Sequence, residues 1–245
     1  MSLLYGIHAV AEALKAHPDR IEKLCIERGN RNSRVRDIVE LARRNRIRIS
    51  FEEKSWLDRK TGGSRHQGVL CHAAEIATFK NEDILKQARH PGILLVLDGI
   101  EDPHNVGAIL RSAEAAGVDG VFLPRHRSAG LSASVMKSSA GAASHVKISR
   151  ITNVSQFLET LKEKGFWIAG LDAASDQPIW EMDLTVPVAL VLGGEGRGLH
   201  RLVKQKCDFI ASLPIYGNVG SYNVSVSAGM ALYEVLRQRK RKEQT

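Results

Sequence analysis

Three hydrogen-bonding side chains occur at every second position in the stretch LPIYGNVGSYNVSVSAG, residues 213–229, just before a segment with helical spacing. They are Ser221, Asn223 and Ser225. Ser and Asn are common N-cap residues, so a helix cap explains any one of them alone. Three in alternation exceed what a single cap requires. We therefore interpret this stretch as a candidate functional site.

A second candidate is the loop GGEGRGL, which follows the apolar run VALVL and holds one carboxylate, Glu195, among four glycines. Glycines let backbone amides approach a ligand closely. The loop is not a Walker loop, because no Gly-Lys-Ser/Thr follows, and its glycine spacing excludes the dinucleotide fingerprint of a Rossmann dehydrogenase. Glu195 is either a helix cap, or it holds an active-site arginine or a substrate hydroxyl.

The third candidate is the stretch DPHNVGAILR, which follows the apolar run ILLVLD. Asn105 lies near the expected start of a helix, where it is either a cap or a site residue. Arg111 lies six residues further, in an otherwise apolar helix. It is either a surface charge or a group that holds a phosphate or orients a hydroxyl. His104 is a weak candidate base, and no spacing typical of metal ligands occurs, so no metal is expected.

All three stretches follow strand-like runs, at residues 93–98, 188–194 and 208–214. From residue 93 onward, apolar strand patterns alternate with helical patterns, which predicts an α/β fold with a parallel sheet covered on both faces. In such sheets, ligands bind at the carboxyl ends of the strands. We therefore expect the three stretches to lie close together.

The chain before this sheet reads as a smaller α/β domain. We expect it to span residues 1–76, with a helix over 33–45 that Ser33 could cap. Residues 77–92 are polar and read as a linker with a possible short helix. The second domain then spans 93–245 and includes a helix over 134–144.

Composition and charge indicate the class of partner. The 245 residues are 43% hydrophobic and carry a net charge of +8, which favours a polyanionic partner. Eight arginines lie between Arg28 and Arg48, on either a solvated helix face or a phosphate-contacting surface. Three distant cysteines fit a reduced, cytoplasmic compartment, and neither a signal peptide nor a membrane span is expected.

Together, the three motifs resemble the SpoU (TrmH-like) family of RNA ribose 2′-O-methyltransferases, in the SPOUT superfamily. They occur in the family's order as DPHNVGAILRSAEAAG, LVLGGEGRGL and LPIYGNVGSYNVSVSAGMALYEVLRQR. The first segment, with YGIHAVAEAL and HQGVLCHA, looks like the small L30e-like substrate-binding domain of enzymes that methylate a guanosine of 23S ribosomal RNA. The resemblance thus covers nearly the whole chain.

The resemblance implies a fold, a cofactor and partners that composition does not. The catalytic domain would be a parallel sheet with a deep trefoil knot, which departs from the usual absence of knots. The methyl donor would be S-adenosyl-L-methionine. The enzyme would be a homodimer whose active site is completed across the interface, and its substrate would be 23S rRNA.

The family's motif residues correspond to six candidate catalytic positions: Asn105, Arg111, Glu195, Ser221, Asn223 and Ser225. The resemblance also implies cofactor contacts, largely from the backbone, at Gly193, Leu213, Ile215 and Tyr222. Relatives often carry Leu in place of Tyr222 and Met in place of Tyr216. A contact through the backbone tolerates both departures.

The implied reaction is transfer of a methyl group to a ribose 2′-OH, which is a poor nucleophile at neutral pH. We expect Arg111 to stabilise the developing alkoxide and Glu195 to orient Arg111 or bind a substrate hydroxyl. Two alternatives stay open: a tRNA guanosine 2′-O-methyltransferase of the same family, and a non-catalytic rRNA-binding assembly protein. The complete motif set argues against the second.

Overall fold

The computed structural model describes residues 2–16, 18–73 and 78–244. Contacts divide the chain into two compact units, Met1–Ala77 with Gly130–His145, and Thr78–Ala129 with Val146–Thr245. The segment Gly130–His145 thus groups with unit 1, although its sequence pattern placed it in the second domain. The domain boundaries predicted at residues 76 and 93 stay predictions.

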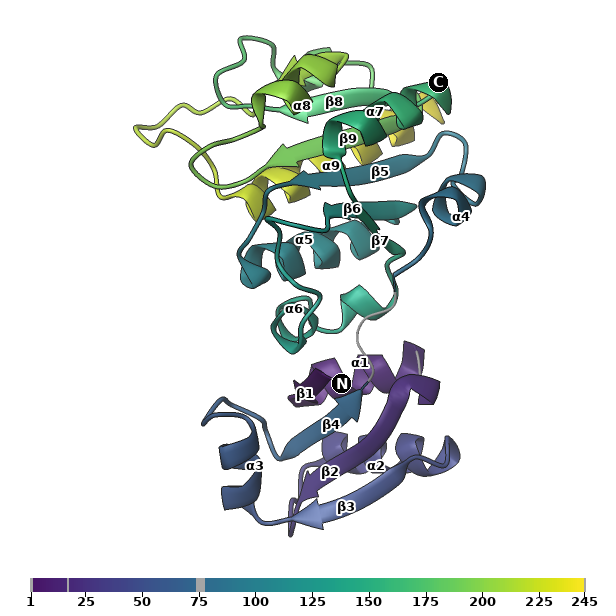
Figure 1. Cartoon of the computed structure of the whole chain (residues 1–245), viewed down its shortest axis with the longest axis vertical. Coiled ribbons are helices and arrows are strands. Elements are labelled where there is room, and N and C mark those ends of the chain that lie inside the picture. Colours follow the sequence, from purple (N-terminus) through teal and green to yellow (C-terminus); the bar gives the residue numbers. More distant parts are fainter. Residues whose placement is uncertain (1, 17, 74–77, 245) are drawn as a thin grey trace. The chain divides into compact units, whose positions relative to one another are not determined.

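Unit 1 is built on a four-stranded sheet in the order β1-β4-β2-β3 (Figure 1). Its strands are β1 (Ser2–Tyr5), β2 (Ile21–Glu27), β3 (Arg48–Glu52) and β4 (Val69–Ala73). The β2–β3 pair is parallel, and β4 is antiparallel to both of its neighbours. The helices are α1 (Ile7–Ala16), η1 (Pro18–Arg20), α2 (Ser33–Arg44) and α3 (Lys54–Lys60).

Helix α2 is amphipathic, and this pattern attaches it to the sheet. Val35, Ile38 and Ala42 are buried, while its arginines stay exposed. The predicted cap at Ser33 was wrong by one residue. Ser33 is the first helical residue, and the Asn32 side chain accepts a hydrogen bond from the backbone N–H of Arg34 at 3.0 Å. Either side chain has the chemistry of a cap, so the backbone decided between them.

The segment Gly130–His145 holds α6 (Ala133–Ser138) and η2 (Ala142–Ser144), and α6 packs on β1. The Lys137 ammonium lies 4.5 Å from the centroid of the Tyr5 ring. At the other end of the segment, His145 Nε2 lies 3.1 Å from Glu12 Oε2. These polar contacts add to packing and explain why the segment belongs to unit 1.

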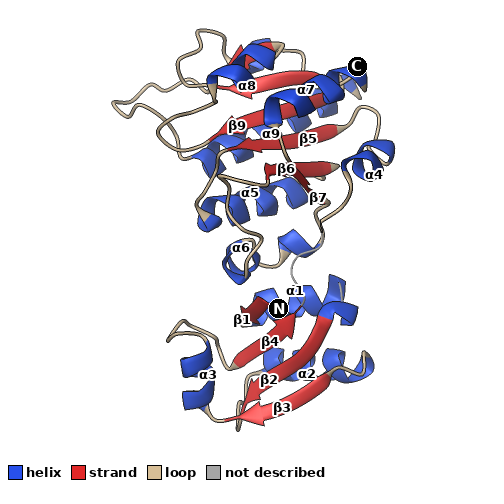
Figure 2. Cartoon of the chain, in the orientation of Figure 1, coloured by secondary structure: helices blue, strands red, loops and turns tan. Residues whose placement is uncertain are grey.

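Unit 2 is an α/β layer structure, as the alternating pattern predicts (Figure 2). Its six strands are all parallel, in the order β10-β8-β9-β5-β6-β7. They are β5 (Ile93–Asp98), β6 (Gly120–Pro124), β7 (Ile148–Ile151), β8 (Trp167–Leu171), β9 (Val188–Gly193) and β10 (Phe209–Ala211). β5 and β9 are buried along nearly their whole length, which explains their unbroken apolar sequences.

Helices cover both faces of this sheet. They are α4 (Asn81–Lys86), α5 (Pro103–Ala115), α7 (Val154–Glu163), η3 (Ile179–Glu181), α8 (Arg201–Lys206) and α9 (Val224–Lys242). Alternate strand residues, including Leu94 and Val96, form one core with α4, α7 and α8. Successive strand side chains point to opposite faces, so the remaining residues of β5 face the other layer. There α5 and α9 pack against each other, and α9 also contacts β9.

The strand order places a topological switch point between β5 and β9. From β5 the chain proceeds to β6 and β7 on one side, whereas β9, β8 and β10 lie on the other. Asp98, at the end of β5, is the register partner of Gly193, at the end of β9. Two motif loops therefore leave the sheet side by side, where ligands bind in open α/β sheets. The trefoil knot stays a prediction.

Candidate active site

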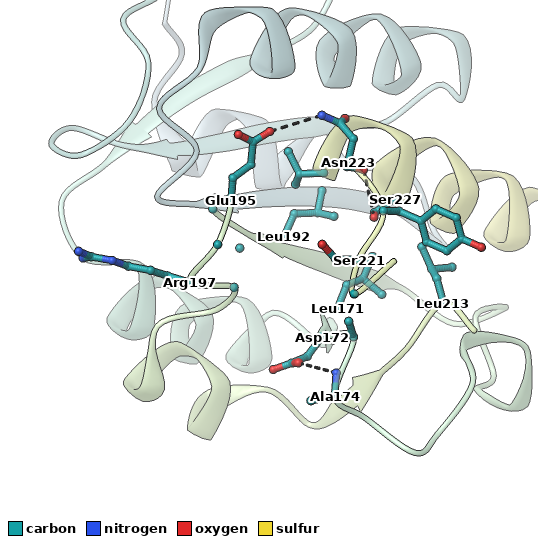
Figure 3. A pocket seen from close by; sticks show the side chains of 18 of the residues that line it. Leu171, Asp172, Ala174, Leu192, Glu195, Arg197, Leu213, Ser221, Asn223 and Ser227 are labelled. Atoms are coloured by element: carbon teal, nitrogen blue, oxygen red, sulfur yellow. Dashed lines mark hydrogen bonds between the residues drawn. The ribbon is translucent and has the colours of Figure 1, made fainter. Parts of the chain in front are cut away.

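A cavity of about 800 Å³ lies at the carboxyl ends of β8 and β9. Its walls are formed by residues 171–174, 192–198 and 213–227 in part, so two of the three motifs line it (Figure 3). All four residues implied for cofactor contacts line it: Gly193, Leu213, Ile215 and Tyr222. Ser221, Glu195 and Asn223 line it too. Their roles stay predictions, but the fold brings them to one place.

Three polar side chains from distant parts of the chain meet at this edge of the sheet. Asn105 Nδ2 donates a hydrogen bond to Glu195 Oε1, and Asn223 Nδ2 donates to Asn105 Oδ1 at 3.0 Å and to Glu195 Oε1 at 3.4 Å. Asn105 is buried, whereas Glu195 and Asn223 are exposed. We call these three residues the polar cluster. It joins one residue from each motif, as the strand-end rule predicts.

Asn223 serves the polar cluster and the helix start at the same time. Its Oδ1 accepts hydrogen bonds from the backbone N–H of Ser225 at 2.9 Å and from the Ser225 hydroxyl at 2.6 Å, so it is the N-cap of α9. Its Nδ2 is then left to donate into the cluster. An amide can do both because it carries a donor and an acceptor, whereas a serine cap has no comparable reach. The cap role of Asn223 is therefore confirmed, and its role in the site stays a prediction that the hydrogen bonds to Asn105 and Glu195 are compatible with.

The two serines on either side of Asn223 differ in their surroundings. Ser221 is exposed and lines the large cavity, whereas Ser225 does not line it and is half-buried against Asn223. Tyr222, expected to act through its backbone, also uses its side chain. Its hydroxyl donates to the Pro214 carbonyl at 3.2 Å and so ties together the two ends of the loop 213–223.

Arg111 lies apart from the other candidate residues. It is exposed on α5 and lines neither the large cavity nor the smaller one beside it. Within residues 2–16, 18–73 and 78–244, no side chain forms a hydrogen bond or ion pair with its guanidinium. Among the described residues no hydrogen bond or ion pair joins Arg111 to Glu195, whose carboxylate accepts hydrogen bonds from the two asparagines.

Close backbone packing explains the glycine at the start of the motif-two loop. A Cβ on Gly193 would lie 2.1 Å from the carbonyl carbon of Gly198, well inside contact distance. The loop therefore folds back on itself, and Gly198 donates a backbone hydrogen bond to the Gly194 carbonyl at 3.0 Å. Any larger residue at 193 would force the loop open, and the cavity wall with it.

Two aspartates at strand ends were not singled out by the sequence. Asp172 follows β8, lines the large cavity and binds Lys204 Nζ at 2.6 Å. This hydrogen bond, followed by one from the backbone N–H of Ala174, lowers the pKa of Asp172. Asp98 ends β5, is buried, and holds His200 on the opposite side of the motif-two loop. Their position directly after an apolar strand was the signal that could have found them.

Other classes of site are not found in the part of the chain that the structure describes. No group of three or more His, Cys, Asp or Glu side chains is placed to hold a metal ion. No helix there is both long and apolar enough to span a bilayer. The three cysteines are free.

Residues 92–233 match the SpoU rRNA methylase family. The chain belongs to this family. Residues 3–79 match a second family, the substrate-binding domain of RNA 2′-O ribose methyltransferases. The protein is thus a SpoU methyltransferase with an amino-terminal substrate-binding domain, which confirms the family resemblance and the fold class.

Named SpoU relatives resemble the chain over almost its full length. It is 43% identical to the 23S rRNA (guanosine-2′-O-)-methyltransferase RlmB of Neisseria meningitidis, over 96% of this chain and 95% of the relative. Identity to RlmB of Nitrosomonas europaea is 41%, over 96% and 91%. The fold is shared with the SpoU methyltransferase AviRb from Streptomyces viridochromogenes, solved in complex with AdoMet, at a TM-score of 0.82 and 23% identity, covering 98% of this chain and 90% of AviRb.

Proposed function

We propose that this protein transfers a methyl group from S-adenosylmethionine to the ribose 2′-oxygen of a guanosine in 23S rRNA. One observation carries the proposal: the three motif segments converge on the polar cluster, beside a cavity that all four expected cofactor residues line. Two relatives with this printed activity align along almost the whole chain. The site and the substrate-binding domain would therefore serve one reaction.

The large cavity fits the proposed cofactor in size and chemistry. Its volume of about 800 Å³ lies within the range of small-molecule sites. Leu171, Leu192 and Ile215 supply apolar surface suited to the faces of a purine, and the glycine loop supplies backbone groups for its polar edge. When bound, S-adenosylmethionine supplies an electrophilic methyl group on a sulfonium.

The chain's own residues would position and activate the ribose. The polar cluster holds Glu195 at the cavity edge, where its carboxylate can accept a hydrogen bond from a ribose hydroxyl. Ser221, exposed on the cavity wall, offers a further hydroxyl to the sugar. Arg111 would stabilise the 2′-alkoxide, although as an arginine it is always charged and is a poor candidate for the base. Much of the acceleration would come from holding the two substrates in line.

Arg111 lines neither cavity of its own chain. We therefore propose that it acts at a site that a second copy of the chain completes. Helix α9 carries exposed apolar residues with helical spacing: Val226, Met230, Tyr233 and Leu236. Tyr233 is 70% exposed. An apolar stripe of this kind on a soluble protein marks an interface. A homodimer through this stripe would bury it, together with the neighbouring surface of α5 that holds Arg111.

The arginines of unit 1 would bind RNA phosphates. Helix α2 and the loop before it expose Arg31, Arg34 and Arg36 on the polar side of the helix. Each phosphate contact releases counterions, so the affinity for RNA should fall steeply as salt is added. Replacing Arg31 and Arg34 by alanine should weaken RNA binding at all salts and reduce the slope of log K against log salt by about two.

The experiment that tests the proposed function compares ribosomal RNA from cells with and without this protein. Ribose 2′-O-methyl groups are mapped across 23S rRNA, and the unmethylated RNA is then incubated with purified protein and S-adenosylmethionine. We expect one guanosine 2′-O-methyl group to be missing from the cells that lack the protein and to be restored by the purified protein in vitro. Methylation of tRNA with none of 23S rRNA would overturn the proposal in favour of a tRNA enzyme.

The free cysteines accord with a cytoplasmic location, which we also propose.

A further inference from the structure

A second, smaller cavity lies on the other side of the motif-two loop. Its volume is about 330 Å³, and it lies beside the carboxyl end of β5 and the start of α5. Gly194, Glu195, Arg197 and Gly198 line both cavities. Glu195 of the polar cluster is thus accessible from both cavities. This is the position expected for a residue that lies between a bound methyl donor and a bound methyl acceptor. The size of the second cavity suits a single nucleoside.

The floor of this cavity is preformed. Asp98 is buried at the end of β5, and its Oδ2 accepts the backbone N–H of His200 at 2.8 Å and lies 3.0 Å from His200 Nδ1. The imidazole ring lies over Gly99, where an added Cβ would come within 3.1 Å of the ring. A Cβ on Gly194 would lie 2.3 Å from the Gly99 carbonyl oxygen. Close backbone packing and a buried carboxylate therefore fix the shape before any ligand arrives.

Most carboxylates that line the cavity already have hydrogen-bond partners within the chain. Asp98 holds His200, Asp102 caps α5 by accepting the backbone N–H of His104, and Glu195 accepts from the two asparagines. Glu101 is exposed, and no described residue pairs with its carboxylate. The cavity therefore presents one free carboxylate, and it lies at the rim rather than against the sheet.

Free cations face the same cavity. Arg127 and Arg197 line it without an ion-pair partner among the described residues. Arg127 has a φ of 53°, an uncommon backbone conformation for a residue other than glycine. Its loop is held by the half-buried Arg150, whose guanidinium donates to the carbonyls of Pro124 and Ala129 at 2.8 and 2.7 Å. Arg150 thus anchors the backbone on both sides of Arg127.

We propose that this second cavity binds the target nucleotide of the RNA, with Glu101 reading the base as guanine and Arg127 contacting a flanking phosphate. This inference rests on the proposed methyltransferase function. A carboxylate only accepts hydrogen bonds, and guanine presents two adjacent donors, N1–H and the 2-amino group. Adenine presents an acceptor at N1, which would face the carboxylate unfavourably. Glu101 is therefore a specificity-determining residue, and Arg127 holds the nucleotide without reading it.

The test compares guanine with hypoxanthine, which lacks only the 2-amino group. Synthetic fragments of 23S rRNA carry guanosine or inosine at the mapped target, and kcat/KM is measured for each. Wild type should prefer guanosine roughly tenfold, the effect of one hydrogen bond to a charged group. Glu101→Gln replaces one acceptor by a donor and should bring the ratio close to one. A ratio unchanged in Glu101→Gln would overturn the assignment.

The ratio is the informative quantity, because removing a negative charge can by itself raise affinity for RNA. The matched control is Glu163→Gln, an exposed glutamate at the end of α7 that lines neither cavity. It should keep the wild-type ratio. Arg127→Ala should raise KM for both fragments equally and leave the ratio and the affinity for S-adenosylmethionine unchanged. A changed ratio in Arg127→Ala would contradict the division of roles.

A binding measurement separates this inference from the proposed function. Guanosine and inosine 5′-monophosphate are titrated into the full chain, and binding is followed by calorimetry and by the NMR signals of the His200 ring. Preference for the guanosine nucleotide that disappears in Glu101→Gln supports the cavity assignment even if no RNA is methylated. Equal binding of both nucleotides by wild type overturns it even if 23S rRNA is methylated.

Discussion

The polar cluster and the outer face of α5 and α9 carry residues of the same motifs, yet they are in opposite states. Asn105, Glu195 and Asn223 satisfy one another within one chain. Arg111 lies on the same helix as Asn105 but is exposed and unpaired among the described residues, on a helix that packs against α9. The polar cluster is thus hydrogen-bonded within one chain, whereas for Arg111 we propose that a partner surface covers it.

This difference matters because electrostatic stabilisation depends on the exclusion of water. A charge pair at about 4 Å is worth roughly 1 kcal/mol in bulk water and several times more in a drier setting. Arg111 in solvent would therefore do little for an alkoxide. Covered by RNA and a second chain, it would act in a less polar medium. We therefore propose that the chain preforms the polar cluster, which would position the substrate, whereas Arg111 would be enclosed only when RNA and a second chain are bound.

The largest effect should come from Arg111→Ala. We expect turnover on 23S rRNA to fall by roughly 10²-fold or more, as when one pre-aimed donor is lost, with the affinity for S-adenosylmethionine unchanged because Arg111 does not line the large cavity. Single-turnover rates and cofactor titrations measure the two quantities. Arg111→Lys should restore little, since an ammonium lacks the planar fork. Methylation near the wild-type rate would show that the exposed face is not part of the site.

The second effect tests whether the exposed stripe needs a partner. Tyr233→Glu places a charge in the centre of the stripe, so the dimer should dissociate and activity should fall about tenfold or more at protein concentrations where wild type is dimeric, since one unpaired charge in a buried interface costs several kcal/mol. Sedimentation and dilution series measure both. The control is Phe79→Glu, a second exposed aromatic outside α9. An unchanged oligomeric state in Tyr233→Glu would contradict the proposed interface.

The third prediction separates the role of Asn223 in the polar cluster from its role as the N-cap of α9. Asn223→Ser keeps a capping oxygen but loses the amide donor, whereas Asn223→Ala loses both. Turnover should fall several-fold in both variants, by the loss of a hydrogen bond worth about 1 kcal/mol. The melting temperature should fall clearly only in the alanine variant. Equal melting temperatures in the two variants would mean that the cap of α9 contributes little. Wild-type turnover in both would remove the cluster from the mechanism.

The sequence predicted the polar cluster better than it predicted the surroundings of Arg111. Parallel strands present their carboxyl ends at one edge of the sheet, so the three motifs were expected to lie there, and the observed pairing of β5 with β9 brings Asn105 and Glu195 together. The exposure of Arg111 did not follow, because helical spacing alone does not say which face another molecule will cover. The motif residues identified the family, but the surroundings of Arg111 depend on tertiary contacts and, in the proposed dimer, on the second chain.

Similar reasons explain the differences elsewhere. The strand β1 has only four residues, too few for an alternating pattern, and its pairing with β4 is set by distant contacts. Asn32 and Ser33 are equally good caps in sequence, and the backbone chose Asn32. The segment Gly130–His145 has an ordinary helical pattern, and only its packing on β1 places it in unit 1. Local sequence patterns identify helices and strands, whereas tertiary contacts decide to which compact unit they belong.

The smallest effect concerns Asp172, which is paired within the chain like the cluster but is partly solvated. Lys204 lowers its pKa, so this carboxylate stabilises the fold above its unfolded pKa of about 4, and the contribution is lost as pH falls through the folded-state value. Asp172→Asn should lower the melting temperature by a few degrees at pH 7, reflecting at most about 1 kcal/mol. The deficit should shrink as the pH is lowered below 4. Asp176→Asn, an exposed aspartate in the same loop, should show neither change. A deficit that persists at low pH would mean that the asparagine disturbs packing rather than the ion pair.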